Sequence, residues 1–491
     1  MRRFLLPAAV LAVAVIASVL AGGANDAAAP DQASTGETVD SLATPLFSVR
    51  RAPEWLRQPT TDNLLDTAVR APVEALAGTG FACLAVHVNG EPVTEVASDV
   101  PLIPGEVQRL LTLAALDTVG TGGFTTEVVR SSGAVITEEG VLEGDLWLLG
   151  GADPVLSTNP YISRFDDGRA FTSLEELALT TIVALRDAGI TEIGGRIIGV
   201  DTKYEGSPQV FSDTYWTAAE RRSGTVGLTS GLLVDNGFTS FPADAGDPSA
   251  NVRSSDPVGH AASTFRDVLV ALDMPVTGGA EAGDAPSAVD REPVARIESP
   301  ALEEIAQRAL ADGTTAEMLW REAALRGGNP ADGLGAIFFV NAAMVELGLL
   351  GSDEAGNFPK VDGSGLSLEN RAQCGTLVGV LDPQTAGLAE AALPAVADSP
   401  LASCAPSSLA SLRVTAAARP EVTSMAGIAT AANGDLITFA VIADWLPDAS
   451  GAFGPQAVCD GLLPAVLEAI AQHPAGPDLA DLTPLDPVPA E

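Results

Sequence analysis

Lysine is almost absent from this chain: its 491 residues contain only two, Lys203 and Lys360. Histidine is also scarce, with three residues, and aromatic residues make up only 5% of the chain. Asp and Glu number 64 against 26 Lys and Arg, so the formal net charge is −38. A charge of this sign argues against nucleic acid and against an anionic membrane surface as partners.

Cysteine is limited to four residues, Cys83, Cys374, Cys404 and Cys459. No CxxC pair or Cys/His cluster is present, so we expect no metal site and no cofactor. An even number of cysteines can pair fully in an exported protein, and spacing alone leaves three connectivities open. We expect Cys374 to pair with Cys404 across a short loop, and Cys83 to pair with Cys459, tying the first core strand to the last helix.

The N-terminal segment predicts export. Two arginines precede the apolar run 4–21, and small residues follow it. This pattern is typical of a cleaved secretory signal, although a run of this length can also remain as a membrane anchor. We therefore interpret 1–29 as a signal peptide or N-terminal anchor, 30–60 as a flexible linker and 474–491 as a disordered tail. The expected location is extracellular or in the cell envelope, with membrane contact only through that anchor.

The segment 101–120 predicts a helix with one buried face, because its apolar residues recur at helical spacing. These are Val107, Leu110, Leu111, Ala114 and Ala115. We also expect a hairpin at 83–98 around Asn89-Gly90, a single helix at 301–326, two strands within 414–445 and a C-terminal helix at 456–472.

The wording of 101–120, PLIPGEVQRLLTLAALDTVG, resembles the P-A-S-x-x-K-L-L-T-A-A helix of the D-alanyl-D-alanine carboxypeptidase/endopeptidase family, the class C penicillin-binding proteins. On that pattern Glu106 stands in place of the nucleophilic serine and Arg109 in place of the lysine. Acylation needs an attacking hydroxyl and an amine that can lose a proton, and a guanidinium stays protonated. Glu106 and Arg109 can instead form an ion pair at i, i+3 near the helix start.

Two further segments resemble the domain that this family inserts between its catalytic motifs. They are LWLLGGADPVLS at 146–157 and VGLTSGLLVDNGF at 226–238. The resemblance then spans roughly 62–473.

This resemblance implies an α/β (α+β) fold of the penicillin-binding-protein/β-lactamase-like type. An antiparallel sheet flanked by helices would be formed by the discontinuous segments 61–123 and 239–473. A smaller inserted α/β domain would occupy 124–238.

The second family motif, S-D-N-x-x-A-E, corresponds to ADGTTAE at 311–317. Asp312 and Glu317 match it, whereas Ala311 and Gly313 replace the serine and the asparagine. The resemblance therefore implies that the proton relay and the contact to the substrate amide are absent.

The third motif, K-T-G, corresponds to Thr415, Ala416 and Ala417, so the cation that would hold the substrate carboxylate is missing. The family's D-G-S-G-L-S loop is intact at 362–367. We interpret it as a loop beside the cleft whose glycines set the backbone, with a residual peptide contact through Ser364 as an alternative. Asp312, Glu317, Asp362 and Ser364 are then the residues expected in a residual cleft.

The two lysines allow a test that needs no alignment. A serine three residues before either lysine would be required for S-x-x-K, and those positions hold Val200 and Asn357.

These observations predict an exported, cell-wall-associated member of the serine-type D-alanyl-D-alanine carboxypeptidase family that is catalytically inactive and serves in peptidoglycan-related binding or scaffolding. The expected partners are peptidoglycan stem peptides or a cell-wall synthesis protein. The alternative is an active serine-type carboxypeptidase/endopeptidase that trims stem peptides. Covalent labelling by a penicillin separates the two.

Overall fold

The computed structural model describes most of the chain between Ala52 and Pro474. The described residues are 52–77, 82–120, 122–165, 170–204, 216–222, 224–243, 252–352, 360–385, 387–405, 411–444 and 458–474. The predicted signal segment 1–29 and all but the first residue of the predicted tail lie outside them. The chain divides into two compact units, Met1–Trp55 and Leu56–Glu491. Apart from the first residues of helix α2, every element below belongs to the second unit.

A five-stranded antiparallel sheet with the order β15-β16-β17-β1-β2 forms the first layer. Its strands are β1 (Ala82–Val88), β2 (Glu91–Val96), β15 (Arg413–Ala418), β16 (Val422–Thr430) and β17 (Leu436–Asp444). The predicted hairpin at 83–98 is confirmed, with positive φ at Asn89 and Gly90 in its turn. The two strands predicted within 414–445 are instead three, because the chain reverses once more after Ala418.

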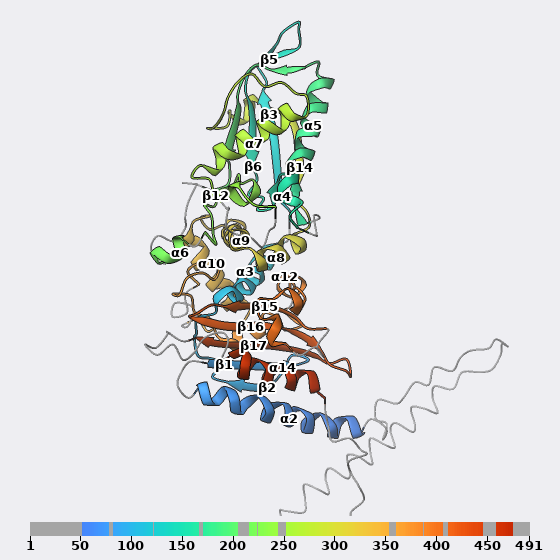
Figure 1. Ribbon diagram of the computed structural model, residues 1–491, viewed down its shortest axis with the longest axis vertical. Helices are drawn as coiled ribbons and strands as arrows, with labels where there is room; N and C mark the ends of the chain where they lie inside the picture. The colour runs from blue at the N-terminus through green and yellow to red at the C-terminus, as the bar shows by residue number, and fades with distance from the viewer. Residues whose placement is uncertain are drawn as a thin grey trace, which may run out of the picture. The chain divides into compact units, whose positions relative to one another are not determined.

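Helices cover both faces of this sheet (Figure 1). Helix α2 (Ala52–Ala77) and helix α14 (Leu463–Gln472), which follows a π-helical turn at Val458–Leu462, pack on the face that includes Leu84 and Val86. Because α2 begins at Ala52, it starts inside the segment predicted as a linker.

The opposite face, which includes Cys83 and Ala85, packs against a larger group of helices. This group contains η2 (Gly105–Gln108), α3 (Arg109–Asp117), α8 (Leu302–Ala311), α9 (Gly313–Arg326), α10 (Gly333–Glu346), α11 (Cys374–Gly379) and α12 (Leu388–Ala391). Short 3₁₀ turns follow at Val396–Asp398 and Ala402–Cys404. The predicted helix within 101–120 is confirmed, whereas the single helix predicted at 301–326 is two helices separated at Asp312.

A second five-stranded sheet, with the order β13-β10-β6-β3-β14, contains both parallel and antiparallel pairs. Its strands are β3 (Thr125–Ser131), β6 (Leu146–Gly150), β10 (Ile197–Asp201), β13 (Ala280–Ala282) and β14 (Arg291–Glu298). Helices α5 (Leu174–Asp187) and α7 (Pro257–Ala271) share its apolar core. The sheet takes strands as far as Glu298, well past residue 238, where the sequence placed the end of the inserted domain.

Short elements surround this second sheet. They are β4 (Val135–Ile136), β5 (Val141–Glu143), β7 (Leu156–Ser157), α4 (Asn159–Ile162), β8 (Thr172–Ser173), β9 (Glu192–Ile193), α6 (Ala218–Arg222), η4 (Asp235–Gly237), β11 (Phe238–Ser240), β12 (Val252–Arg253) and η5 (Ala288–Asp290). The architecture is therefore the expected one: an antiparallel sheet flanked by helices, joined to a smaller α/β part.

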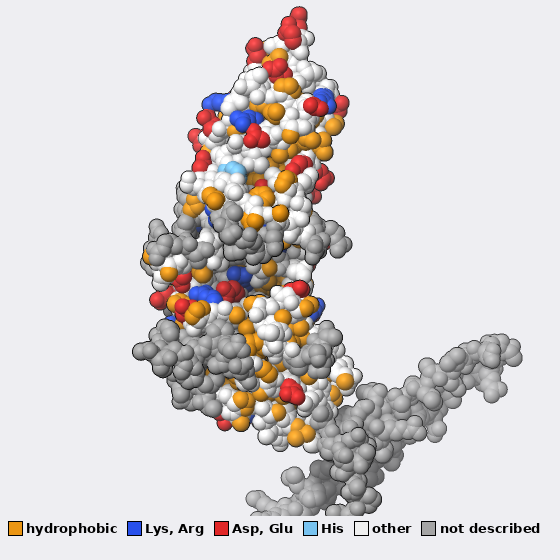
Figure 2. Space-filling model, in the orientation of Figure 1, with side chains coloured by type: hydrophobic (Ala, Val, Ile, Leu, Met, Phe, Trp, Pro, Cys, Tyr) orange, Lys and Arg blue, Asp and Glu red, His pale blue; other side chains and the backbone are white. Residues whose placement is uncertain are grey.

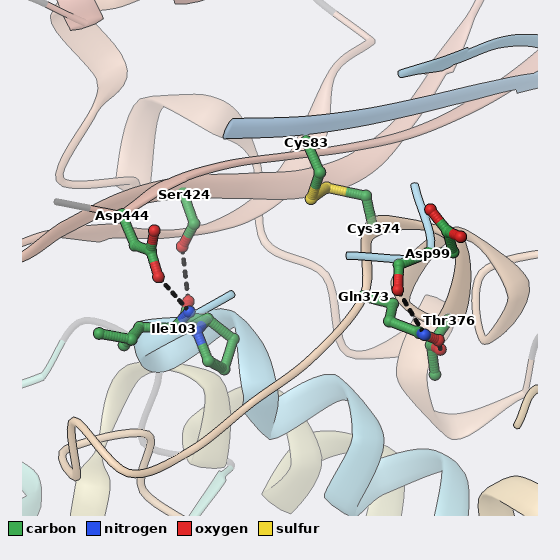
Figure 3. The surroundings of a disulfide bond; sticks show 9 residues. Cys83, Asp99, Ile103, Gln373, Cys374, Thr376, Ser424 and Asp444 are labelled. Atoms are coloured by element: carbon green, nitrogen blue, oxygen red, sulfur yellow. Dashed lines mark hydrogen bonds between the residues drawn. A yellow bond between two sulfur atoms is a disulfide. The ribbon is translucent and has the colours of Figure 1, made fainter. Parts of the chain in front are cut away.

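Two disulfides are present, Cys83–Cys374 (Figure 3) and Cys404–Cys459, so the predicted pairing is wrong. The reason is the alternation of side chains along β1. Cys83 points toward the face covered by α11, which begins at Cys374, whereas α14 lies on the opposite face together with Cys404. The last helix therefore lies on the wrong side of the sheet to reach Cys83.

Acidic side chains are spread over the face shown in Figure 2, with basic ones among them. No helix in the described part of the chain is both long enough and apolar enough to cross a bilayer.

Candidate active-site cavity

Three segments that are distant in sequence line one cavity of about 810 Å³. The first is the start of the η2–α3 helix, the second is the junction of α8 and α9, and the third is strand β15. Together they contribute Glu106, Arg109, Ala311, Asp312, Gly313, Thr415 and Ala416. Apart from Asp312, which matches the family motif, these are six of the seven positions at which the aligned catalytic residues are replaced. The seventh, Ala417, is buried beneath the cavity wall and packs against Gly105.

The start of the η2 helix is fixed against the first sheet (Figure 3). The Ile103 amide donates a hydrogen bond to Asp444 Oδ2 at 2.9 Å, and Ser424 Oγ donates to the Pro104 carbonyl at 2.6 Å. Gly105 follows with a φ of +57°, and an added Cβ there would lie 2.6 Å from the Ala417 Cβ. A residue without a side chain is required for this approach, and it delivers Glu106 to the cavity.

Glu106 lies in the first turn of η2 and has no ion pair in the described part of the chain. Its Oε2 is buried and has no hydrogen-bond partner among the described residues. Neither does Glu106 form an ion pair with Arg109 in this part of the chain, so the predicted i, i+3 pair is wrong. The reason is that the Arg109 side chain turns away toward two carbonyl groups.

Arg109 connects three elements. Its Nε donates to the Ser364 carbonyl and its Nη1 to the Leu310 carbonyl, each at 2.7 Å. Burial lowers the pKa of this guanidinium, and nearby carboxylates, including Glu106 and Asp312, oppose that shift. An arginine remains a cation under such conditions, so Arg109 provides no base.

The α8–α9 junction is organised by Asp312. Its Oδ1 accepts from the Thr315 amide at 2.8 Å, which caps α9, and its Oδ2 accepts from Asn236 Nδ2 at 2.7 Å. Burial alone would raise the pKa of this carboxyl, but Arg308, Arg253 and the hydrogen bonds hold it below its ordinary value. Asp312 is thus a charged structural residue at the cavity edge.

Gly313 begins helix α9 beside a segment of the inserted part. A Cβ at this position would lie 2.9 Å from Val226 Cγ2 and 3.4 Å from the Thr225 carbonyl. An asparagine, which the family motif has at this position, would need these neighbours to move. The space that the asparagine side chain would use is therefore partly filled.

Strand β15 forms a wall without a free cation. Thr415 and Ala416 line it and are nearly buried. Arg419, just after the strand, donates from Nη1 to the Gly365 carbonyl at 3.0 Å and from Nη2 to the Leu366 carbonyl at 2.9 Å. Its Nη2 also lies 3.7 Å from Glu220 Oε1. Its donors are therefore used within the protein.

The D-G-S-G-L-S loop is a buried support. Asp362 Oδ1 accepts from the Gly365 amide at 2.8 Å and from Asn370 Nδ2 at 2.9 Å, and its Oδ2 accepts from the Ser367 amide at 2.7 Å and from Trp216 Nε1 at 2.6 Å. Asp362 has no exposed surface. The interpretation of the loop as a backbone-setting element fits these contacts.

Glu317 supports the same loop from helix α9. Its Oε1 accepts from the amides of Gly363 and Ser364, each at 3.0 Å. Burial, together with the nearby Asp362 carboxylate, raises the pKa of Glu317 to about 8. Glu317, Asp362 and Ser364 are all fully buried and do not line the cavity. Of the four residues expected in a residual cleft, only Asp312 reaches it.

A second group of cavity residues was not predicted from the sequence. Arg308, on helix α8, lines the cavity together with Phe165 and Phe171. The centre of its guanidinium lies 3.9 Å from the Phe165 ring centroid and 5.1 Å from that of Phe171. The two phenylalanines are far from Arg308 in the chain, and no spacing rule connects them; only the position of Arg308 one turn before Asp312 could have drawn attention to it.

A model of the D-Ala-D-Ala carboxypeptidase 3 (S13) family matches residues 65–241 and 236–403. This chain belongs to the S13 family. The family comprises serine-type D-Ala-D-Ala carboxypeptidases, so the resemblance detected from the sequence is confirmed.

Two crystal structures of one penicillin-binding protein have a similar fold. Penicillin binding protein 4 (dacB) from Haemophilus influenzae is 16% identical, with a TM-score of 0.58, over 80% of this chain and 96% of that one. The complex of the same protein with a β-lactam is 16% identical, with a TM-score of 0.56, over 79% of this chain and 95% of that one. A predatory endopeptidase from Bdellovibrio bacteriovorus, in complex with an immunity protein, is 14% identical, with a TM-score of 0.49, over 80% of this chain and 93% of that one. No curated protein sequence matches significantly.

Proposed function

We propose that this protein is a catalytically inactive S13 homologue that is exported to the cell envelope and binds a peptidoglycan stem peptide or a cell-wall synthesis protein without hydrolysing it. The observation that carries the proposal is that a cavity is present where the family's active site is expected, while the aligned catalytic residues are replaced. Glu106 and Arg109 occupy the aligned serine and lysine positions and line a space of about 810 Å³.

The groups around the cavity do not supply an activated nucleophile. Its hydroxyl groups, among the described lining residues, belong to Thr225, Ser399 and Thr415, and none of those lining residues is a lysine or a histidine. Serine acylation needs a base that can accept the hydroxyl proton, and Arg109 cannot. Thr415 is moreover nearly buried in β15.

The remaining structure supports binding. Arg109, Glu317 and Asp362 keep the surrounding helices and the D-G-S-G-L-S loop in place through buried hydrogen bonds. A site that had only decayed would not need these contacts, which hold an open cavity with charged and aromatic walls. Family membership by itself does not transfer the activity, because function depends on the site.

One observation favours the alternative, an active carboxypeptidase with a relocated nucleophile. Ser399 lines the cavity next to the carboxylate of Asp398. However, Ser399 Oγ accepts a hydrogen bond from the Leu401 amide at 3.1 Å, a turn contact that does not activate it.

Export is supported by the two arginines and the apolar run at the N-terminus. Fractionation of the producing cells, with immunodetection of the protein, tests it: recovery in the cytoplasm alone would contradict export.

The decisive test of inactivity is incubation with a fluorescent penicillin, beside an active S13 carboxypeptidase as positive control and heat-denatured protein as negative control. We expect no covalent label and no D-alanine released from a pentapeptide. A label that maps to Ser399 and disappears in Ser399→Ala would establish the alternative, and a label at any serine or threonine would overturn inactivity.

A further inference from the structure

Arg308 is a cation whose guanidinium contacts, among the described residues, are with aromatic rings. Its guanidinium stacks on Phe165 and Phe171, whose own rings lie 5.1 Å apart at 30°. Within the described part of the chain it makes no hydrogen bond and no ion pair. The aromatic rings hold a guanidinium in one plane while leaving its N–H groups available.

The carboxylates nearest in sequence make no direct contact with Arg308 among the described residues, although its charge lowers the pKa of Asp312. Glu304 lies one turn before it on α8 and Asp312 directly after the end of that helix, and neither is within ion-pair distance among the described contacts. The Asp312 oxygens are already bonded to the Thr315 amide and to Asn236. Arg308 therefore presents its donors to the cavity that it lines.

The other cavity arginines differ in this respect. Arg419 bonds to two carbonyls and approaches Glu220, and Arg109 uses Nε and Nη1 on two carbonyls. Of these three arginines, Arg308 alone makes no hydrogen bond through its guanidinium N–H groups within the described part of the chain.

We propose that Arg308 holds a carboxylate group of a bound peptide, so that the anion contact of this site comes from helix α8 and not from strand β15. This inference rests on the proposed binding function. Strand β15 has Thr415, Ala416 and Ala417 where the family motif has its cation. A guanidinium can grip a carboxylate through two parallel hydrogen bonds, and a planar, stacked guanidinium loses little freedom in doing so.

Binding is measured by fluorescence anisotropy with three labelled peptides of otherwise equal sequence. The first ends in D-Ala-D-Ala with a free carboxylate, the second is its C-terminal amide, and the third is an amide that carries a glutamate side chain. We expect at least about tenfold weaker binding of the second peptide than of the first, which corresponds to one lost charge-assisted contact. The third peptide tells whether a side-chain carboxylate serves as well as a terminal one.

Variants connect this discrimination to Arg308. Arg308→Gln should lower the affinity for the acid about tenfold and abolish the preference over the amide, and Arg308→Lys should retain part of it. Arg164→Gln is the matched control, because Arg164 stacks on Tyr161 and Phe241 at 5.0 and 4.9 Å, and more distantly on Phe165 at 5.8 Å, but does not line the cavity. Its affinity should stay within about twofold of wild type.

Thermal melts verify that each variant is folded, and the comparison of acid with amide on the wild type needs no variant. Equal binding of acid and amide, no binding of any of the peptides, or a loss of affinity in Arg164→Gln equal to that in Arg308→Gln would overturn the assignment of Arg308. Penicillin labelling would instead overturn the proposed inactivity, so the two failures are distinguishable.

Discussion

Arg109 is the residue whose observed contacts differ most from the role that our alignment would give to its position. A lysine can lose its proton when buried, whereas an arginine cannot, and its planar fork can donate in two directions at once. In this chain the fork joins the Ser364 and Leu310 carbonyls. At the position that our alignment gives to the catalytic lysine, Arg109 thus links the loop to helix α8.

The double substitution Glu106→Ser with Arg109→Lys restores the S-x-x-K pair and should still give no penicillin acylation. Gly313 packs against Val226, and Thr415 supplies no cation for the substrate carboxylate. The ammonium of a lysine cannot reproduce both hydrogen bonds of the Arg109 guanidinium, so the free energy of unfolding should fall by about 1–3 kcal/mol. Fluorescent penicillin and urea denaturation measure both effects, with Arg109→Lys alone as control. Measurable acylation would show that the pocket had lost only its nucleophile.

Glu317 should make stability depend on pH. Its pKa of about 8 lies above the ordinary 4.5, so the folded state retains a proton that the unfolded state loses first. The stabilising contribution of the protonated form is complete below about pH 4.5 and is lost as pH rises toward 8, by up to about 1.4 kcal/mol per pH unit.

Glu317→Gln keeps an oxygen that can accept from the Gly363 and Ser364 amides but cannot ionise. As pH rises from 5 to about 8, wild type should therefore lose unfolding free energy relative to this variant. Urea denaturation at several pH values measures the difference. Parallel pH profiles would mean that Glu317 is ionised in the folded protein.

At the scale of elements, the cavity depends on the break between α8 and α9. Asp312 adopts an extended conformation, with φ −121° and ψ 122°, and caps α9. Periodicity continues across the break, so the sequence predicts one helix at 301–326. An aspartate followed by a glycine is a cap signal, but only the hydrogen bond from the Thr315 amide to Asp312 shows that the chain uses it there.

The D-G-S-G-L-S loop depends on a close backbone approach at Gly365. Its φ is +78°, and an added Cβ would lie 2.2 Å from the Gly105 carbonyl oxygen. Gly348 has a similar φ of +73° with nothing within 4 Å of its Cβ position. The pair separates the cost of the conformation from the cost of the contact.

Gly348→Ala should therefore cost about 1–2 kcal/mol, the price of a left-handed alanine. Gly365→Ala should cost about 1–3 kcal/mol more, because the cavity-side helix start and the loop must also separate. Thermal and urea denaturation of both variants give the comparison. Equal losses would show that the loop can move away from η2 without penalty.

At the scale of the whole molecule, the sequence predicts elements that neighbouring residues determine. It does not predict which distant segments join a sheet or cover one of its faces. The hairpin at 83–98 and the helix within 101–120 follow from turn residues and spacing. The extent of the second sheet does not, because β14 joins it from far along the chain. The cavity-lining Phe165 and Phe171 were likewise missed, because their contact with Arg308 is tertiary.

The disulfides illustrate the same limit. Cys83 could be assigned to a core strand, but its partner is decided by which face of β1 it occupies. One-residue alternation places Cys83 with α11 and Leu84 with the cluster that contains α14. The sequence contains this alternation, but it does not say which helix covers which face.

The two disulfides should contribute unequally to stability, because they close loops of different length. Cys83–Cys374 spans 291 residues of sequence, whereas Cys404–Cys459 spans 55, and the two loops do not overlap. By loop entropy alone, Cys83→Ala with Cys374→Ala should lose roughly 6 kcal/mol and Cys404→Ala with Cys459→Ala roughly 4 kcal/mol. Peptide mapping under non-reducing conditions first verifies the connectivity, and urea denaturation of the two double variants then ranks them. A peptide linking Cys83 to Cys459 would contradict the connectivity, and a larger loss from the Cys404 and Cys459 variant would show that native packing outweighs loop closure.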